Sequence, residues 1–522
     1  MLQDDKKSET KIGAYVLETL TTGMYTNPLD SLREYVQNSF DSIKDAEELG
    51  ILPGNGGRID IIIDREKRSL KIRDNGKGVA AAEIKNLLMN IGMSSKSIES
   101  NAGFRGIGRL AGIAYCDRLV FKTQVKDEME ISQFTFNCIE LRKSMSASMR
   151  QVEELSEIFS RHSSIENYSL RKKDHFFEVI MEGINPEVEI FLNWEKIKKY
   201  LSQTAPLGFD AQTFPLTGDI IAWLKEHNIT MPTVSLKING PVDVEVFKPY
   251  EKLTYSTKKE HYKVHVKGIN FYPKDASPES PFWIWYAETN LPGMISDDKV
   301  SGLRLRKNNI SIGGVDRVTE IFEDVAKSHV RFNAYFLGEI HIQDPNIIPN
   351  ARRDGFEDTS SWVKICQELK EFAKLRIKEV QDASKSRNID IEKLIRPAVR
   401  EIENVESRKK TGLASKGERD SLIKKIKDRE EKLESAIKAE RSETDIKKIR
   451  EVKAKLVSAK NYLEKISNFT TQNLNPALDR KQVKIVREII EILYDVLPEI
   501  EFEKARDAIL AKYQVNAKED KD

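Results

Sequence analysis

The segment LREYVQNSFDS, residues 32–42, carries three polar side chains whose types and spacing could support chemistry. Glu34, Asn38 and Asp41 follow one another at intervals of four and three residues, so an α-helix would place them on one face. A carboxylate, an amide and a second carboxylate in one row suit a general base, a metal ligand and an orienting group. The polar face of a solvated surface helix has the same pattern, so this segment alone leaves both interpretations open.

A second segment, DNGKG, begins at Asp74 and follows a strand-like stretch in which Leu70 and Ile72 alternate with charged residues. Asp74 would lie at the end of that strand. Gly76 and Gly78 would let the backbone approach a flat ligand closely. An ordinary turn is the alternative, because Asp-Asn-Gly is common turn chemistry.

A third segment, GFRGIGRLAG at residues 103–112, follows the Ser- and Lys-rich loop MSSKSIESNAG. Its glycines permit tight turns, and the apolar residues after them could begin a helix whose N-terminus faces phosphate. The loop has the composition of a phosphate-covering lid, although a mobile surface loop looks the same. The glycine pattern is weak by itself and lacks the Lys-Ser/Thr ending of a P-loop.

In this order, the three segments resemble the nucleotide site of the GHKL superfamily, which includes gyrase, MutL, the ninety-kilodalton heat-shock chaperone and the MORC ATPases. LREYVQNSFDS is similar to the chaperone's ExxxNxxD helix, and DNGKG to the adenine-binding DxGxG loop. GFRGIGRLAG is similar to the glycine-rich lid hinge. The resemblance implies an α/β fold with an N-terminal GHKL (Bergerat) two-layer sandwich that binds ATP and Mg²⁺ and hydrolyses ATP.

The resemblance also implies roles for individual residues. Glu34 would polarise the attacking water, Asn38 would bind Mg²⁺, and Asp74 would accept a hydrogen bond from the adenine amino group. The other implied nucleotide-binding residues lie in the same segments and the lid: Asp41, Gly76, Gly78, Ser94, Ser95, Lys96, Gly103, Phe104, Arg105, Gly106, Ile107 and Gly108. The chain departs from the family at Phe176 and Phe177, where relatives carry a Gly-Thr whose hydroxyl helps to hold adenine.

A fourth segment, IIPNARRDGFE at residues 347–357, resembles the chaperone's middle-domain loop, which delivers an arginine to the terminal phosphate. By position that arginine is Arg353, and its positive charge would stabilise the transferred phosphoryl group. Arg352 and Lys307 remain alternatives, as does a purely structural salt bridge.

The chain divides by composition into three predicted domains. Residues 1–200 form the ATP-binding domain, within which residues 140–174 lack strong periodicity and are interpreted as an insertion. Residues 201–375 form an α/β transducer-like middle domain, and residues 376–522 form a helical, partly coiled-coil region.

Heptad repeats mark the helical region. Ile449, Leu456 and Leu463 recur every seven residues, and a weaker run contains Ile426 and Leu433. The two runs are out of phase, so they predict a folded-back helical hairpin. We expect a homodimer held by this region, with a purely intramolecular hairpin as the alternative.

Composition narrows the class of protein further. Lys plus Arg is 85 and Asp plus Glu is 83, which gives a net charge of +2 in 522 residues. This balance does not indicate a nucleic-acid binder, although it leaves room for a local basic patch. The three cysteines form no metal or disulfide pattern. With no signal-peptide pattern and no apolar run of membrane-spanning length, we expect a cytoplasmic protein without membrane contact.

Two functions fit these features. The first is an ATP-gated clamp, chaperone-like or MORC-like, that closes on a protein or nucleic-acid client. The second is a regulatory subunit whose nucleotide state controls a separate effector protein, as in bacterial anti-phage defence. Histidine kinases share the nucleotide fold but lack a water-activating glutamate, so Glu34 argues against that class.

Overall fold

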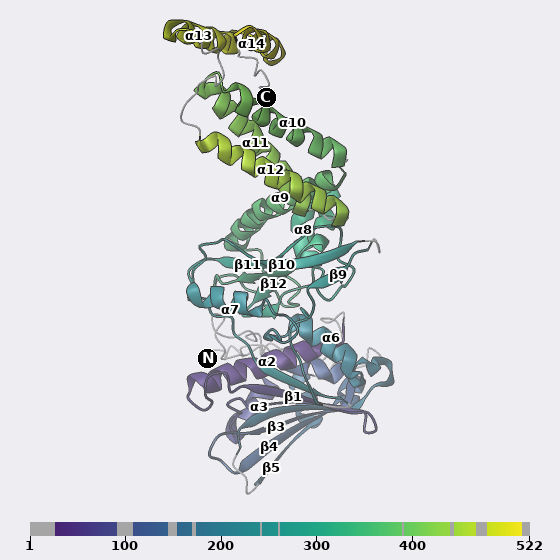
Figure 1. Cartoon of the computed structure of the whole chain (residues 1–522). Helices are drawn as coiled ribbons and strands as arrows, with labels where there is room; N and C mark the ends of the chain where they lie inside the picture. Colours follow the sequence, from purple (N-terminus) through teal and green to yellow (C-terminus); the bar gives the residue numbers. More distant parts are fainter. Residues whose placement is uncertain are drawn as a thin grey trace, which may run out of the picture. The chain divides into compact units, whose positions relative to one another are not determined.

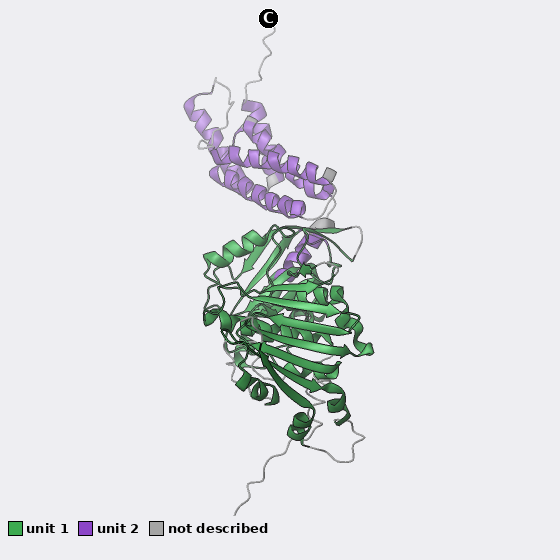
Figure 2. Ribbon diagram, turned by 90° about the horizontal axis from the view of Figure 1, so that it is seen from below, with its two compact units in different colours: residues 1–289, 293–375 green, residues 290–292, 376–522 purple. Residues whose placement is uncertain are grey.

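The computed structural model describes residues 27–90, 108–144, 154–169, 174–240, 243–258, 262–388, 391–438, 443–465 and 478–513. The chain divides into two compact units (Figure 2). One consists of residues 1–289 and 293–375, and the other of residues 290–292 and 376–522. The first unit contains two β-sheets, and the elements described in the second are helices.

The first sheet has the strand order β5-β4-β3-β6-β2-β1-β7-β8. Its strands are β1 (Arg58–Asp64), β2 (Ser69–Asp74), β3 (Cys116–Gln124), β4 (Glu130–Asn137), β5 (Ser163–Ser169), β6 (Phe176–Ile184), β7 (Ser235–Asn239) and β8 (Asp243–Glu245). Neighbouring strands are antiparallel except β1 and β7, which are parallel. Strands β1 and β2 form an antiparallel pair with Ile61 opposite Ile72.

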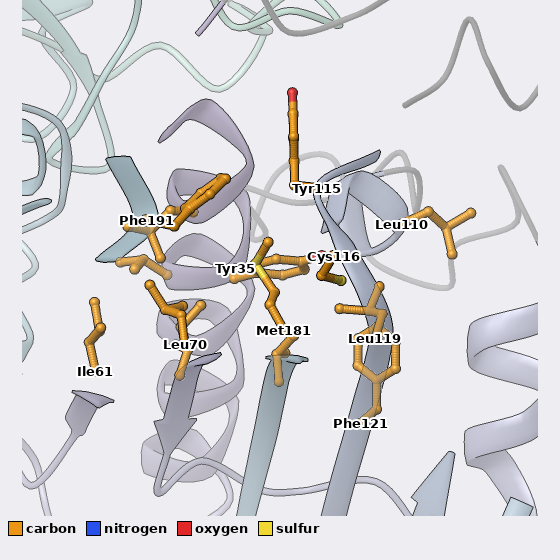
Figure 3. Packing of buried hydrophobic residues seen from close by; sticks show 14 of the residues in the cluster. Tyr35, Ile61, Leu70, Leu110, Tyr115, Cys116, Leu119, Phe121, Met181 and Phe191 are labelled. Atoms are coloured by element: carbon orange, nitrogen blue, oxygen red, sulfur yellow. The ribbon is translucent and has the colours of Figure 1, made fainter. Parts of the chain in front are cut away.

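Helix α2 (Leu29–Glu48) lies across one face of this sheet (Figure 1). Its sheet-facing apolar residues recur at the helical spacing of three or four and are at most 3% exposed: Leu29, Leu32, Val36, Phe40 and Ile43. Figure 3 shows Tyr35 from the helix packed near Leu70 and Met181 of the strands. Helices η1 (Gly108–Ala114) and α6 (Trp194–Thr204) pack beside α2. The predicted two-layer α/β sandwich is therefore the observed fold.

The segment interpreted as an insertion contributes to this sheet. It contains α4 (Cys138–Ser144), α5 (Leu155–Arg161) and strand β5, which pairs with β4 along the sheet edge. Most of β5 is exposed. An exposed edge strand does not need the apolar alternation that identifies a half-buried strand, so residues 163–169 carry no strand pattern.

Strands β7 and β8 follow residue 200 in the chain and yet extend the first sheet. Ser235 of β7 is paired with Arg58 of β1, and the buried side chains Leu236 and Ile238 join the core beneath α2. A boundary drawn at residue 200 therefore cuts through one sheet and one core.

The second sheet has the order β13-β12-β14-β11-β10-β9. Its strands are β9 (Thr254–Ser256), β10 (Lys263–Tyr272), β11 (Phe282–Thr289), β12 (Gly302–Lys307), β13 (Ile310–Ser311) and β14 (Leu337–Ile342). Helices α7 (Thr217–Glu226), α8 (Asp316–Val325) and η3 (Lys327–Tyr335) accompany it. Its core is aromatic, with Phe209, Phe214 and Tyr250 packed around Trp285.

A fully buried ionic cluster lies within the second sheet. Glu339 of β14 accepts from Lys248 Nζ at 2.7 Å and pairs with Arg306 Nε at 2.6 Å. His341 Nε2 lies 3.1 Å from the same carboxylate, and its ring stacks on Trp283. Two neighbouring cations hold the pKa of Glu339 well below its usual range despite the opposing effect of burial.

In the second unit, α10 (Ile391–Thr411), α11 (Lys416–Lys438) and α12 (Glu443–Lys465) pack around one core. The heptad residues are nearly completely buried in it: Ile426, Leu433, Ile449, Leu456 and Leu463. Glu434 and Glu430 of α11 pair with Lys453 and Lys460 of α12. The heptad seam is thus filled by helices of the same chain, as the intramolecular alternative expects.

Two further helices, α13 (Arg480–Val496) and α14 (Glu499–Tyr513), pack against each other through a small apolar cluster. Among the described residues, no helix is long and apolar enough to cross a membrane.

Candidate active site

The polar row on α2 is largely buried. Glu34, Asn38 and Asp41 lie on the helix face opposite the apolar residues that contact the sheet. Glu34 and Asp41 are only 8% and 3% exposed, whereas Asn38 is partly exposed. Carboxylates on a solvated surface helix would be mostly in water, so the burial of this row favours the functional interpretation.

The DNGKG loop packs against the second half of this row. Asp74 is 2% exposed, and its Oδ1 accepts a hydrogen bond from Gly76 N at 2.9 Å. A Cβ on Gly76 would lie 2.2 Å from Ser42 Oγ. Gly78 has a φ of +69°, and a Cβ there would lie 2.2 Å from the carbonyl oxygen of Gln124. Both glycines are therefore required by the path of the loop.

Polar contacts fix the loop in this place. Lys77 donates its backbone N–H to the carbonyl of Ser42 at 3.2 Å, and its Nζ pairs with Asp45 at 2.6 Å. On the other side, His175 Nδ1 lies 2.8 Å from the carbonyl oxygen of Gly76. The buried carboxylate of Asp74 is thus held close to the end of the polar row.

The start of η1 lies against Glu34. A Cβ on Gly108 would lie 2.5 Å from Glu34 Oε2, so a larger residue would collide with the carboxylate. The hydroxyl of Tyr35 accepts from Gly112 N at 2.7 Å and donates to the Arg109 carbonyl at 3.3 Å. Glu34 and Tyr35 of α2 therefore position the segment that follows the lid.

Most of the predicted lid lies outside the described residues, including Ser94, Ser95, Lys96, Gly103, Phe104, Arg105, Gly106 and Ile107.

Arg353 reaches Glu34 from a distant part of the chain. Its Nε lies 2.8 Å from Glu34 Oε1, and both side chains are 10% exposed. Its backbone has a φ of +55°, a left-handed conformation that non-glycine residues rarely adopt. The turn is fixed because Gly313 N donates to the Arg353 carbonyl at 2.8 Å and the Asn350 amide donates to Asp354 at 2.7 Å. Such strain persists only where surrounding contacts impose it.

The other two predicted cations lie elsewhere. Arg352 is exposed, and its carbonyl accepts from Arg33 of α2 at 3.3 Å. Lys307 donates to the carbonyl of Asp344 at 2.6 Å, and burial lowers its pKa to about 8. Of the three candidates, Arg353 is the one paired with Glu34.

Strand β6 shows what occupies the position of the family's Gly-Thr. Phe177 is in register with Asp74 on one side and with Thr123 of β3 on the other. The Thr123 hydroxyl accepts from Val79 N at 2.7 Å and donates to the Phe176 carbonyl at 3.1 Å. A neighbouring strand thus supplies a buried hydroxyl at this end of the site, and it anchors the residue that follows DNGKG.

Sequence reasoning missed Thr123, His175 and Gln37. Nothing in the sequence indicates that Thr123 is opposite Phe177, because that depends on strand register. Gln37 precedes Asn38 and shares the polar side of α2, but a single glutamine gives no signal until its burial is known.

The residues present fit a nucleotide with a divalent cation. The glycine positions Gly76 and Gly78 let the backbone run where a Cβ would collide, and Asp74 offers a buried acceptor. Asn38 is partly exposed and carries an amide oxygen. The described residues contain no cluster of three or more His, Cys, Asp or Glu suited to a metal ion. A magnesium ion held by Asn38 would take further oxygen ligands from phosphate groups and water, which is its usual mode of binding.

This fold and site define a nucleotide-binding domain of the GHKL type, in which one helix carries the Glu-Asn-Asp row and a strand end carries the buried aspartate. Residues 25–166 match the family model described as Histidine kinase-, DNA gyrase B-, and HSP90-like ATPase. This part of the chain is therefore a GHKL-type ATPase domain. A comparison with curated proteins found no match.

Proposed function

We propose that the protein hydrolyses ATP at this site, with Glu34 as the general base and Arg353 as the cation that acts on the terminal phosphate. The observation that carries the proposal is the buried contact between these two side chains. A general base and a phosphate-binding arginine must both come within reach of the same reacting group. Their contact brings the two side chains to one point, so each could reach a group bound there.

The further roles are carried over from the resemblance to the GHKL family. Glu34 would accept the proton of the attacking water. Asn38 would ligate the Mg²⁺, which when bound neutralises phosphate charge. Asp74 would accept from the adenine amino group, while Gly76 and Gly78 allow close approach of the backbone.

The pairing also implies a change of state. While Arg353 is paired with Glu34, the carboxylate is not free to accept a proton from water. A bound terminal phosphate offers a competing anion, so we infer that Arg353 moves toward it and releases the base. Hydrolysis would then depend on the loop after β14 as well as on the ATP-binding domain.

Contacts between the two sheets support a conformational role for ATP. Tyr200 of α6 donates to Asp30 of α2 at 2.6 Å. At the end of α6, the carbonyl of Gln203 accepts from Arg306 at 2.9 Å, and Arg306 belongs to the ionic cluster on Glu339. A shift of α2 would therefore reach the second sheet by two routes, this one and Arg353. We propose an ATP-gated clamp on this basis.

A clamp of this kind would be a homodimer, and α13 offers the contact. Its apolar residues on one side are large and largely exposed: Ile485, Ile489, Ile492 and Val496. We call these four residues the α13 stripe. Their spacing of four, three and four is that of a coiled-coil seam. Val486 and Ile490 lie on an adjacent side of the helix and pack on α14.

The charge pattern along α13 indicates that a second copy of the same helix covers the α13 stripe. The first half of α13 is basic and the second half acidic: Arg480, Lys481, Lys484 and Arg487, then Glu488, Glu491 and Asp495. This order is unfavourable for the helix dipole, so helix stability does not explain it. In an antiparallel pair of identical helices, each basic half would face the partner's acidic half, as a two-fold interface requires.

The ATPase proposal is tested by replacing Glu34 with Gln. The amide keeps an acceptor for Arg353 and so avoids a bare buried guanidinium, which an alanine would leave. We expect nucleotide affinity within about threefold of wild type and turnover reduced by about 100-fold or more. Full turnover in the folded Glu34→Gln protein would overturn the assignment of the base.

A further inference from the structure

Gln37 is a buried amide for which the described residues supply no hydrogen-bond partner. Its side chain is 1% exposed, and in the described part of the chain neither Oε1 nor Nε2 makes a hydrogen bond. Leaving such a group unsatisfied destabilises the folded state, so native proteins rarely do so without a reason. The cost is explained if a ligand or an ordered water completes the site.

The position of Gln37 indicates what it would contact. It follows Arg33 by four residues and Glu34 by three, so the three side chains are neighbours on the helix surface. Side chains on a helix lean toward its N-terminus, which directs Gln37 over the turn that carries Arg33 and Glu34. That is the turn on which Arg352 and Arg353 dock.

Resting on the proposed function, we propose that Gln37 is a positioning residue that holds the attacking water for Glu34. The amide Oε1 would accept a hydrogen bond from one O–H of the water, and Glu34 would accept a hydrogen bond from the other O–H before taking its proton. Nε2 would donate to an oxygen of the transferred phosphoryl group. Both ends of the buried amide would then be satisfied only when nucleotide and water are in place.

The step balances in atoms and charge. The water oxygen forms a bond to the terminal phosphorus while the bond between that phosphorus and the bridging oxygen breaks. The electron pair of the broken bond stays on the ADP oxygen. One water proton passes to Glu34, and the other remains on the new phosphate. Gln37 exchanges no proton.

The amide group of Gln37 suits a position between the attacking water and the phosphate. An amide offers a donor and an acceptor without charge, so it can bridge water and phosphate. A carboxylate here would repel both Glu34 and the phosphate. A hydrophobic residue would fill the space but could not orient the water.

The experiment compares Gln37→Leu with Ser39→Ala in the full chain. Ser39 is a matched control because it is a buried polar residue on the sheet-facing side of α2. For Gln37→Leu we expect a melting temperature without nucleotide equal to or above wild type, since an unsatisfied amide is removed. Affinity for fluorescent ADP should stay within about threefold, and kcat should fall by about 10- to 100-fold. Ser39→Ala should leave kcat unchanged.

A second variant, Gln37→Glu, separates positioning from packing. Its activity should recover as the pH is lowered, because the protonated carboxylic acid regains a donor and loses its charge, whereas wild type shows no such recovery. A Gln37→Leu protein that melts several degrees lower, or that keeps wild-type kcat, would overturn the proposal. If both Gln37→Leu and Glu34→Gln are fully active, the assignment of Glu34 as the general base is wrong. If Gln37→Leu is fully active and Glu34→Gln is not, the positioning role of Gln37 is wrong and Glu34 remains the general base.

Discussion

Arg353 Nε lies 2.8 Å from Glu34 Oε1 in a contact where both side chains are nearly buried. Removing Glu34 would leave the nearly buried guanidinium of Arg353 without this carboxylate, which is destabilising. Glu34 without Arg353 would keep Arg33 Nη2 at 4.0 Å from its Oε1. The nucleotide-free protein thus has a reason to keep its base and its arginine together. ATP is the ligand whose negative charge could separate them.

The first prediction concerns the arginine. Arg353→Ala should lower turnover by about 100-fold or more, because the transferred phosphoryl group loses its cation. Nucleotide affinity should change by less than about threefold, since the adenine and metal contacts remain. Arg352→Ala is the matched control, because Arg352 is exposed and its carbonyl accepts from Arg33 of α2. Steady-state hydrolysis and equilibrium nucleotide binding are measured for both variants. An inactive Arg352→Ala beside a normal Arg353→Ala would show that Arg352, and not Arg353, acts on the terminal phosphate.

Asp74 provides the second prediction. In Asp74→Asn the side-chain oxygen must still accept from Gly76 N, which leaves the NH₂ group facing the adenine amino group. The amide NH₂ and the adenine amino group are both hydrogen-bond donors, so they cannot pair. We expect the affinity for the nucleotide to fall 10- to 100-fold, about 1.5–3 kcal/mol. Asp45→Asn serves as the control, because it removes the ion pair of Lys77 in the same loop without touching the adenine side. Titration with fluorescent ADP measures both, and equal affinities would count against the role of Asp74.

Much of the site follows from sequence because its parts are local. The row Glu34, Asn38 and Asp41 depends only on helical spacing, and Asp74 continues the alternation of Leu70 and Ile72 in its strand. These relations need no knowledge of which elements meet.

What the sequence leaves open are relations between elements. Adjacent arginines at 352 and 353 cannot be ranked until the backbone of the turn is known, and only the left-handed conformation of Arg353 directs it to Glu34. The hydroxyl of Thr123 enters the site through strand register. The heptad at Leu456 indicates a packed seam without specifying whether its partner helix belongs to the same chain.

The third prediction concerns pH and the ionic cluster of the second sheet. Burial lowers the pKa of His341 to about 4, opposed by Glu339 and reinforced by Lys248 and Arg306. Between about pH 4 and 6.5 the unfolded chain therefore binds more protons at this residue than the folded chain does. Stability falls as the pH decreases through that window.

His341→Phe should reduce this pH dependence. Phenylalanine can stack on Trp283 as the imidazole does, and it does not titrate. From pH 7 to pH 5, wild type should lose about 1–2 kcal/mol more unfolding free energy than the variant, as measured by urea denaturation. Equal losses in the two proteins would mean that His341 does not titrate as its burial implies.

The fourth prediction is the dimer formed by the α13 stripe. A pair of 17-residue helices buries less area than a standard interface, so we expect weak association with a Kd in the micromolar range. Ile489→Ser with Ile492→Ser should make the full chain monomeric at about 20 μM, a concentration set by that range. Val363→Ser, which removes a similarly exposed aliphatic side chain from α9 (Ser360–Asn388), should not. Light scattering on the intact chain without nucleotide measures the difference.

Charge-reversal variants of α13 distinguish an antiparallel from a parallel orientation of the two helices in the dimer. If the helices pair antiparallel, Lys484 faces the acidic half of the partner, and Lys484→Glu should weaken the dimer by placing like charges together. Adding Asp495→Lys to the same chain should restore it, because every antiparallel interface then carries both reversed charges. In a parallel pair, Lys484 would face the partner's basic half, and Lys484→Glu would strengthen association instead. A wild-type chain that stays monomeric at about 100 μM, well above a micromolar Kd, would show that something other than a second copy covers the stripe.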